Sequence, residues 1–107
     1  MTSAAPPPIS PAQPPLFLDY GGRRYAVTVP RFVTGRERGS CHLVLADNNI
    51  SRQHAAVEFS NGAYFILDLG SRNGIGYGGL RIHRKQIVEG DQYELGQHLI
   101  AFSYRNG

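Results

Sequence analysis

Short runs in which every second residue is apolar recur along most of the chain after residue 15. Near the C-terminus, for example, Ile100, Phe102 and Tyr104 alternate with Ala101 and Ser103. A period of two residues is typical of a β-strand that buries one of its faces. This alternation, with one short continuous apolar run at residues 43–45, predicts strands at residues 16–20, 25–29, 32–35, 43–45, 55–60, 65–69, 93–95 and 100–104.

Turn signals separate these runs. Asn61-Gly62 is the strongest of them, because a two-residue type I′ hairpin needs a positive φ at both positions. No stretch repeats apolar residues at the spacing of a helix over three turns. Many short strands, with a turn every eight to twelve residues or so, indicate an all-β sandwich or barrel.

The first fifteen residues have a different composition. They hold six of the seven prolines, with alanine, serine and glutamine, and too little apolar surface to offset the entropy of ordering. We expect residues 1–15 to be a disordered leader or linker, although a proline-rich ligand for another protein would look the same. Residues 16–107 are then long enough for one domain with one hydrophobic core.

Composition narrows the kind of partner and compartment. The formal net charge is +3, and Lys85 is the only lysine, so arginine carries nearly all of the positive charge. The arginine fork binds phosphate or carboxylate through two bonds at once, although a GC-rich genome would produce the same bias. Cys41 is the only cysteine, which leaves no intrachain disulfide and fits a reducing compartment. No signal-peptide pattern or long apolar run is present, so we expect a cytoplasmic protein.

Three stretches lie just outside the predicted strands and are not explained by strand building: Gly35-Arg36, residues 51–54 and residues 70–74. They combine arginine, serine, asparagine and glycine, and none of them contains a carboxylate. Loops at one end of a sandwich often carry binding residues. An arginine fork, hydroxyl groups and turn amides together suit a phosphate dianion.

The order of these residues resembles the forkhead-associated (FHA) domain family, whose pattern is matched by Gly35-Arg36, then Ser51-x-x-His54, then Asn73-Gly74. Two flanking pieces are similar to the family as well, a lead-in at residues 68–71 and a later turn at Gly90-Asp91. The resemblance covers residues 16–104. It rests on the combined pattern, because each piece alone is common.

The resemblance implies an antiparallel β-sandwich of about eleven short strands that binds phosphothreonine peptides through loops at one end. Arg36 would bind the phosphate or the peptide backbone beside it. Ser51 would hydrogen-bond a phosphate oxygen, and Arg52 would add charge to the phosphate or the peptide. Asn73 would bond the peptide main chain. Three residues would support the site structurally, with His54 bracing the loop of Ser51: Gly35, His54 and Gly74.

Two positions depart from the commonest family pattern. Arg72 stands where threonine is frequent, and it would add a phosphate contact, change peptide selectivity or face solvent. Gly78-Gly79 replaces a second Asn-Gly, which keeps the turn and removes any peptide contact of that asparagine. The basic run at residues 81–85 is interpreted as a solvated loop.

The function predicted from the sequence is recognition of phosphothreonine in a partner, either a Ser/Thr kinase or its substrate, by a monomer that needs no cofactor and no metal. An FHA-like scaffold that binds through another surface is the alternative. An enzyme is disfavoured, because Ser51, His54 and Asp68 are triad residue types without a Gly-x-Ser-x-Gly elbow. Nucleic acid is disfavoured because basic and aromatic residues do not interleave. No membrane contact is expected.

Overall fold

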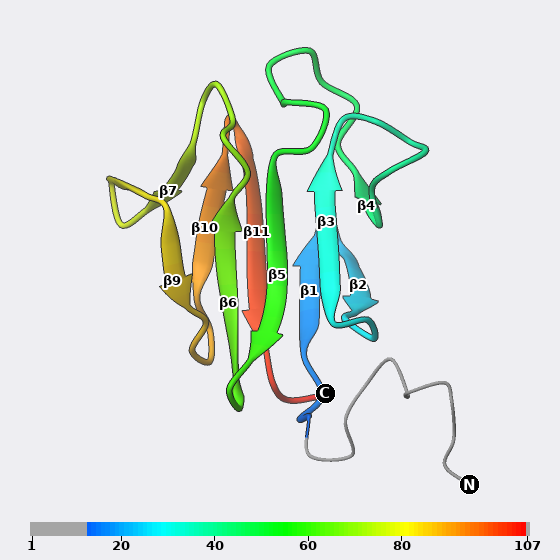
Figure 1. Ribbon diagram of the computed structural model, residues 1–107, viewed down its shortest axis with the longest axis vertical. Coiled ribbons are helices and arrows are strands. Elements are labelled where there is room, and N and C mark those ends of the chain that lie inside the picture. The colour runs from blue at the N-terminus through cyan, green and yellow to red at the C-terminus, as the bar shows by residue number, and fades with distance from the viewer. Residues whose placement is uncertain (1–12, 107) are drawn as a thin grey trace, which may run out of the picture.

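The computed structural model describes residues 13–106, and this part of the chain forms eleven short strands and no helix. The strands divide between two sheets (Figure 1). The six-stranded sheet has the order β2-β1-β11-β10-β7-β8, with the bounds Arg23–Ala26, Phe17–Tyr20, His98–Ser103, Gln92–Leu95, Ile75–Tyr77 and Leu80–Ile82. The five-stranded sheet has the order β4-β3-β5-β6-β9, with the bounds Leu43–Val44, Arg31–Gly35, Ala55–Ser60, Ala63–Asp68 and Arg84–Gln86.

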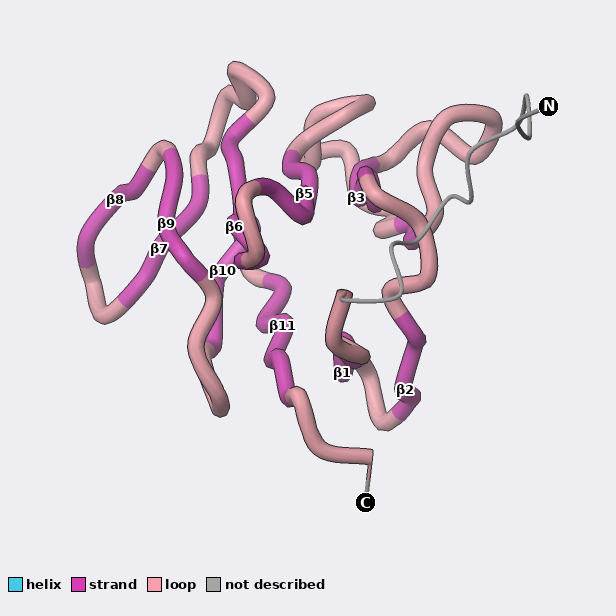
Figure 2. The backbone as a smooth tube through the Cα atoms, turned by 60° about the horizontal axis from the view of Figure 1, so that its bottom comes forward, coloured by secondary structure: helices cyan, strands magenta, loops and turns pink. Residues whose placement is uncertain are grey.

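The two sheets pack face to face as a sandwich. Figure 2 shows them as separate layers, with β3, β5 and β6 in one and β1, β2, β10 and β11 in the other. Neighbouring strands are antiparallel, except that β3 and β4 run parallel. Within residues 13–106, no helix is long and apolar enough to cross a membrane.

The alternating apolar residues meet between the layers. Leu18, Val57, Ile66, Tyr93 and Phe102 are among the side chains that are almost completely buried there. Burial of each such side chain stabilises the fold by about 1.5–3 kcal/mol. The period-two pattern therefore describes the faces of the strands that form this core.

The structure confirms the predicted antiparallel sandwich of about eleven strands. The turn between β5 and β6 has the backbone that a type I′ hairpin requires, with φ 52° at Asn61 and φ 84° at Gly62. The strand expected at residues 25–29 begins earlier, at Arg23, and ends at Ala26; the N–H of Val27 adds one more bond in the register of β1 and β2, to the carbonyl of Leu16 at 2.8 Å.

Three strands, β7, β8 and β9, are missed by the sequence pattern. Each has only three residues, which is too short for alternation to be recognised. The basic run expected as a solvated loop lies mostly in β8 and β9, so the loop assignment was wrong, although Arg81, His83 and Arg84 are exposed as expected. Lys85 is partly buried in β9 because it donates to the carboxylate of Asp91 at 2.7 Å.

Asp91 holds the two sheets together at the turn after β9. Its buried carboxylate accepts bonds from Lys85, Tyr93, Tyr77 and the N–H of Val88, at 2.6–3.0 Å. Burial alone would raise the pKa of this carboxyl, but the four donors outweigh burial and hold the pKa below its ordinary value. The Gly90-Asp91 turn is therefore a structural link between β9 in one sheet and β7 and β10 in the other.

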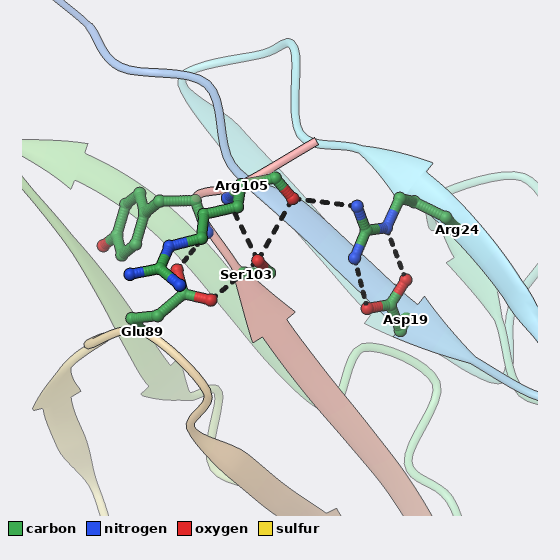
Figure 3. A network of polar contacts seen from close by, with 6 residues as sticks. Asp19, Arg24, Glu89, Ser103 and Arg105 are labelled. Atoms are coloured by element: carbon green, nitrogen blue, oxygen red, sulfur yellow. Dashed lines mark hydrogen bonds and ion pairs between the residues drawn. The ribbon is translucent and has the colours of Figure 1, made fainter. Parts of the chain in front are cut away.

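The end of the sandwich where β1 begins and β11 ends is termed the terminal end. Figure 3 shows its polar network. Arg24 donates to both carboxylate oxygens of Asp19, at 2.8 and 3.0 Å, and to the carbonyl of Arg105 at 2.9 Å. Glu89 accepts a bond from the hydroxyl of Ser103 at 2.8 Å. The charge of Arg24 is thus paired with a carboxylate of the same chain at the surface.

Most of the expected disordered leader, residues 1–12, lies outside the described residues. The last residues assigned to it lie at the terminal end. Gln13 donates to the hydroxyl of Tyr64 at 2.7 Å, and that hydroxyl donates to the carbonyl of Pro14 at 2.7 Å. These bonds hold residues 13–14 against β6.

Candidate functional site

Three loops form the opposite end of the sandwich, which is termed the loop end (Figure 1). They are residues 36–42 between β3 and β4, residues 45–54 between β4 and β5, and residues 69–74 between β6 and β7. The three stretches singled out in the sequence meet here. The reason is that β3, β5 and β6 are neighbours in one sheet, and their loops lie at the same end of these strands.

A pocket of about 430 Å³ opens at the loop end. Arg36, Arg52 and Arg72 line it together with Ser51. The remaining lining comes from the same loop as Ser51: Asn48, Asn49, Ile50 and Gln53. No carboxylate among residues 13–106 is part of the lining. The pocket therefore offers positive charge and hydrogen-bond donors, which are the groups that bind an anion.

Arg36 is positioned by the backbone of the loop at residues 45–54. Its Nε donates to the carbonyl of Ile50 at 3.0 Å, and its own N–H donates to the carbonyl of Ser51 at 3.0 Å. The described part of the chain supplies no carboxylate partner for this half-buried guanidinium. The Nε bond directs the side chain and leaves the two terminal nitrogens for an anion.

Gly35 allows β3 to pass unusually close to the loop at residues 45–54. A Cβ at this position would lie 2.2 Å from the carbonyl oxygen of Arg52. The same oxygen accepts the N–H of Glu37 at 3.1 Å and the thiol of Cys41 at 3.2 Å. A larger residue than glycine would push the Ser51-Arg52 segment away from Arg36.

His54 is completely buried behind the pocket. Its Nδ1 accepts the N–H of Ser51 at 3.2 Å, so the ring proton lies on Nε2, which donates to the carbonyl of Gly74 at 2.8 Å. The backbone N–H of His54 bonds Thr34 at 2.9 Å. A neutral imidazole therefore joins the loop of Ser51 to the loop of Gly74 and to β3.

The turn at residues 71–74 is held by short local bonds. Ser71 donates its N–H to Asp68 at 3.1 Å and accepts the N–H of Gly74 on its hydroxyl at 2.8 Å, where Gly74 has φ 76°. The turn also bonds the neighbouring loop, because the N–H of Arg72 donates to Oγ of Ser51 at 3.1 Å. This bond occupies a lone pair of the Ser51 hydroxyl and leaves its hydrogen for another acceptor.

Asn73 lies beside the pocket rather than in its lining. Its Nδ2 donates to the carbonyl of Asn49 at 2.6 Å. One further N–H and the Oδ1 atom remain on the exposed amide, which is the donor and acceptor pair that an extended peptide main chain needs.

The loop at residues 45–54 is also tied to the other sheet. Oδ2 of Asp47 lies 2.8 Å from Nε2 of His98 at the start of β11, and Oδ1 accepts the N–H of Asn49 at 2.9 Å. The Asn49 N–H, followed by the His98 ring, holds the pKa of Asp47 below its ordinary value. This carboxylate is thus engaged in anchoring the loop and does not face the pocket.

The structure brings the sequence-predicted residues together. Arg36, Ser51, Arg52 and Arg72 line one pocket, Asn73 lies beside it, and the remaining three support the loops: Gly35, His54 and Gly74.

Sequence reasoning missed several groups at the site, and two of them contact the turn at residues 71–74. The first is Asn49, whose only signal is its closeness to Ser51 in the chain. The second is Arg81 in β8, which donates to the carbonyl of Ser71 at 3.2 Å and packs against Gly74, where a Cβ would lie 2.3 Å from its Nε. The basic run at residues 81–85 does not predict this contact, because Arg81 reaches the turn through the pairing of β8 with β7.

The structure is thus a small β-sandwich with an arginine-lined pocket between its loops. The sequence matches the FHA domain family over residues 32–96, and the chain belongs to that family. FHA domains are protein-interaction modules.

Known proteins are similar to this chain over different shares of their lengths. It is 40% identical over 70 residues to the protein phosphatase 1 regulatory inhibitor subunit PPP1R8 homolog of Arabidopsis thaliana, covering 64% of this chain and 18% of that protein. EmbR of Mycobacterium tuberculosis, solved in complex with a low-affinity phosphopeptide, is 28% identical with a TM-score of 0.82, covering 89% of this chain and 26% of that one. The FHA domain of CT664 from Chlamydia trachomatis is 26% identical with a TM-score of 0.76, and the match covers 83% of this chain and 96% of that domain. The chain thus spans a small part of the first two proteins.

Proposed function

We propose that this chain binds phosphothreonine in partner proteins, with the phosphate in the loop-end pocket, and so serves kinase-dependent signalling or assembly. The observation that carries the proposal is the pocket lining, three arginines and Ser51 with no carboxylate from the described residues. Membership of the FHA family and the phosphopeptide bound to the related EmbR support it.

Each group in the pocket has a task in binding the phosphate. A phosphothreonine carries about −1.5 to −2 charges at pH 7. The terminal nitrogens of Arg36 would donate two charge-assisted bonds, and the hydroxyl of Ser51 would donate a third. Such bonds contribute about 1.5–3 kcal/mol each. Arg52, on the rim, would add charge and a further donor.

The peptide around the phosphate would lie extended beside Asn73, whose remaining donor and acceptor pair with its main chain. Threonine should be preferred to serine, because its methyl group fills a small apolar site and restricts χ1. One buried methyl accounts for about 1 kcal/mol, or roughly fivefold in affinity. Aspartate or glutamate mimics should bind poorly, since they have fewer oxygens and less charge.

The geometry argues against a hydrolase at the same residues. Both ring nitrogens of His54 are engaged with backbone groups, one with the N–H of Ser51 and the other with the carbonyl of Gly74. The hydroxyl of Ser51 meets the N–H of Arg72 instead of the ring. A serine nucleophile needs a base within hydrogen-bond reach of its hydroxyl, and His54 does not take that position.

The partner in this proposal is a Ser/Thr kinase or one of its substrates, and the module acts as a monomer in the cytoplasm. These parts rest on the sequence and on the likeness to the family. They are tested by identifying captured partners and by measuring the mass of the free and bound module in solution.

The decisive experiment is binding of a degenerate phosphothreonine peptide library and its unphosphorylated counterpart to the wild type and to Arg36→Ala. We expect binding that requires the phosphate and is lost in a mutant with an unchanged unfolding transition. Binding of neither library by a folded wild type would overturn the proposal and favour a scaffold that uses another surface. Binding with steep salt dependence but no phosphopeptide selectivity would favour nucleic acid.

A further inference from the structure

A chain of hydrogen bonds runs from β1 in the six-stranded sheet to Asn73 at the loop end. The hydroxyl of Tyr20 lies 2.7 Å from Nδ1 of His98, and Nε2 of His98 lies 2.8 Å from Oδ2 of Asp47. The other carboxylate oxygen, Oδ1, accepts the N–H of Asn49 at 2.9 Å. The carbonyl of Asn49 in turn accepts a bond from Nδ2 of Asn73 at 2.6 Å. These four bonds therefore connect β1 and β11 to the side chain beside the pocket.

The carboxylate of Asp47 fixes the direction of the bonds. The N–H of Asn49, followed by the His98 ring, holds the pKa of Asp47 below its ordinary value, so this group is ionised at neutral pH and can only accept. Nε2 of His98 must therefore carry a hydrogen. When the ring is neutral, Nδ1 is left to accept the hydroxyl hydrogen of Tyr20. The bond from β1 thus holds His98 in the tautomer that donates to the loop at residues 45–54.

Asp47 orients the next residues of its loop through two bonds. Oδ1 accepts the N–H of Asn49, and the main-chain carbonyl of Asp47 accepts the N–H of Ile50 at 2.9 Å. The peptide group between residues 49 and 50 is thereby held with its carbonyl toward Asn73. Because that carbonyl accepts Nδ2, it determines which atoms of the Asn73 amide remain for the peptide.

The loop has a second attachment beside His98, at the turn before β11. Ile50 is buried, and its Cδ1 lies 3.3 Å from the position that a Cβ on Gly96 would take. This packing does not depend on the His98 ring. A substitution of His98 should therefore leave the loop in place and change the direction of the Asp47 carboxylate.

We propose that His98 is a positioning residue for phosphopeptide binding, which acts through this chain of bonds to set the orientation of the Asn73 amide. The inference rests on the function proposed above, in which Asn73 pairs with the peptide main chain. The bonds that direct Arg36 lie outside the chain. His98 should therefore influence affinity for an extended peptide and have no influence on affinity for a bare phosphate.

Two substitutions at this one position separate the two ring nitrogens. In His98→Gln, the amide nitrogen lies as many bonds from the backbone as Nε2, so a donor to Asp47 is kept. In His98→Asn, the amide oxygen takes the place of Nδ1, so the bond from Tyr20 is kept and the donor to Asp47 is lost. The variants are matched controls for each other, because each replaces the ring with a carboxamide and keeps one of its two bonds.

Four quantities are measured for the wild type and both variants. The side-chain amide of Asn73 is followed in a proton–nitrogen correlation spectrum of the free module, because a bonded amide proton is shifted and exchanges slowly with water. Affinity is titrated with a phosphothreonine peptide selected from the library, and with inorganic phosphate, which has no main chain. Denaturant unfolding gives the stability of each variant.

We expect His98→Gln to keep the Asn73 resonance and to bind the peptide like the wild type. His98→Asn should show the resonance of a free amide and bind the peptide about fivefold more weakly, which corresponds to the loss of one neutral hydrogen bond. Inorganic phosphate should bind all three proteins with the same weak affinity.

An unchanged Asn73 resonance or an unchanged peptide affinity in His98→Asn would overturn the inference and leave the proposed function intact. Equal losses in the two variants, in proportion to their stabilities, would make His98 a general stabilising residue and would also overturn it. A parallel loss of affinity for inorganic phosphate would assign the effect to the whole pocket, against Asn73. If the wild type bound no phosphothreonine peptide while the Asn73 resonance still followed the donor at residue 98, the proposed function would fail and the positioning of Asn73 would stand.

Discussion

Arg24 at the terminal end and Arg36 at the loop end are held in similar ways but differ in what neutralises them. Each donates to a backbone carbonyl, of Arg105 in one case and of Ile50 in the other. Arg24 also makes two bonds to the carboxylate of Asp19, whereas no carboxylate of the described residues pairs with Arg36. Arg24 is therefore paired within the chain, whereas Arg36 is directed by a neutral acceptor and keeps its charge for the phosphate that we propose.

The support around Arg36 is complete without a ligand. Thr34, His54 and Ser71 are buried polar residues at the loop end, and no buried side-chain nitrogen or oxygen of the described residues lacks a hydrogen-bond partner. The charge in the pocket therefore sits on a scaffold whose own polar groups are satisfied. Variants of the two ends should separate binding from stability.

The largest effect is expected from Gly35→Ala. The added methyl group would overlap the backbone carbonyl of Arg52, so we expect a loss of unfolding free energy of about 3 kcal/mol, together with loss of phosphopeptide binding. Denaturant unfolding and peptide titration measure the two. Gly39→Ala, in the loop that follows β3, is the control, because nothing lies within 4 Å of its Cβ position. Equal stabilities of the two variants would contradict the close approach of β3 to the loop.

Arg36→Lys tests whether directed geometry or charge alone matters. Lysine keeps the charge but loses the Nε bond to Ile50 and the paired terminal donors. Affinity for a phosphothreonine peptide should fall about tenfold, by the loss of one charge-assisted bond, with little change in the unfolding midpoint. Calorimetric titration would show it. Wild-type affinity in the lysine variant would mean that a point charge is sufficient.

The pH dependence should separate binding from folding. The phosphate loses its second negative charge as pH falls through about 6, so affinity should fall by up to about tenfold between pH 7.5 and 5. The carboxyl groups of Asp91, Asp47, Glu89 and Asp19 have lowered pKa values in the fold. Such groups stabilise the fold above their unfolded pKa, near 4, and lose this contribution only as pH falls toward the folded value.

The fold should therefore persist through the range in which binding weakens. Circular dichroism and thermal unfolding at each pH provide the control. A flat affinity between pH 5 and 7.5 would contradict recognition of the phosphate dianion.

The smallest effect is expected at the terminal end, from Arg24→Gln. The ion pair with Asp19 is solvent-exposed, and pairs of this kind contribute little to stability because water and salt screen them. The unfolding midpoint should shift slightly and phosphopeptide affinity should stay unchanged. A marked loss of affinity in this variant would break the distinction between the two ends.

The sequence predicts the parts of this fold that depend on local pattern. Alternation locates most long strands, and Asn61-Gly62 fixes one hairpin through its positive φ angles. The short strands β7–β9 depend on tertiary partners instead. The Lys85 side chain is partly buried because its ammonium group donates hydrogen bonds to Asp91 and Tyr93. These two residues lie six and eight positions further along the chain.

The candidate site divides in the same way. Motif order identifies Arg36, Ser51 and Asn73 as candidates, because the family resemblance preserves their order and spacing. The contacts of Asn49 and Arg81 follow from how loops and strands meet in space, and no local sequence pattern encodes them.

The terminal end also determines how the module can be attached to something else. Strand β1 begins, and strand β11 ends, at the end of the sandwich opposite the pocket (Figure 1). A fusion partner, a tether or a sensor surface joined directly before Gln13 or after Asn106 would stand about one strand length away from the loops. The domain can therefore be immobilised or fused in either order with its binding face directed outward, so an array of copies would present the same face to solution.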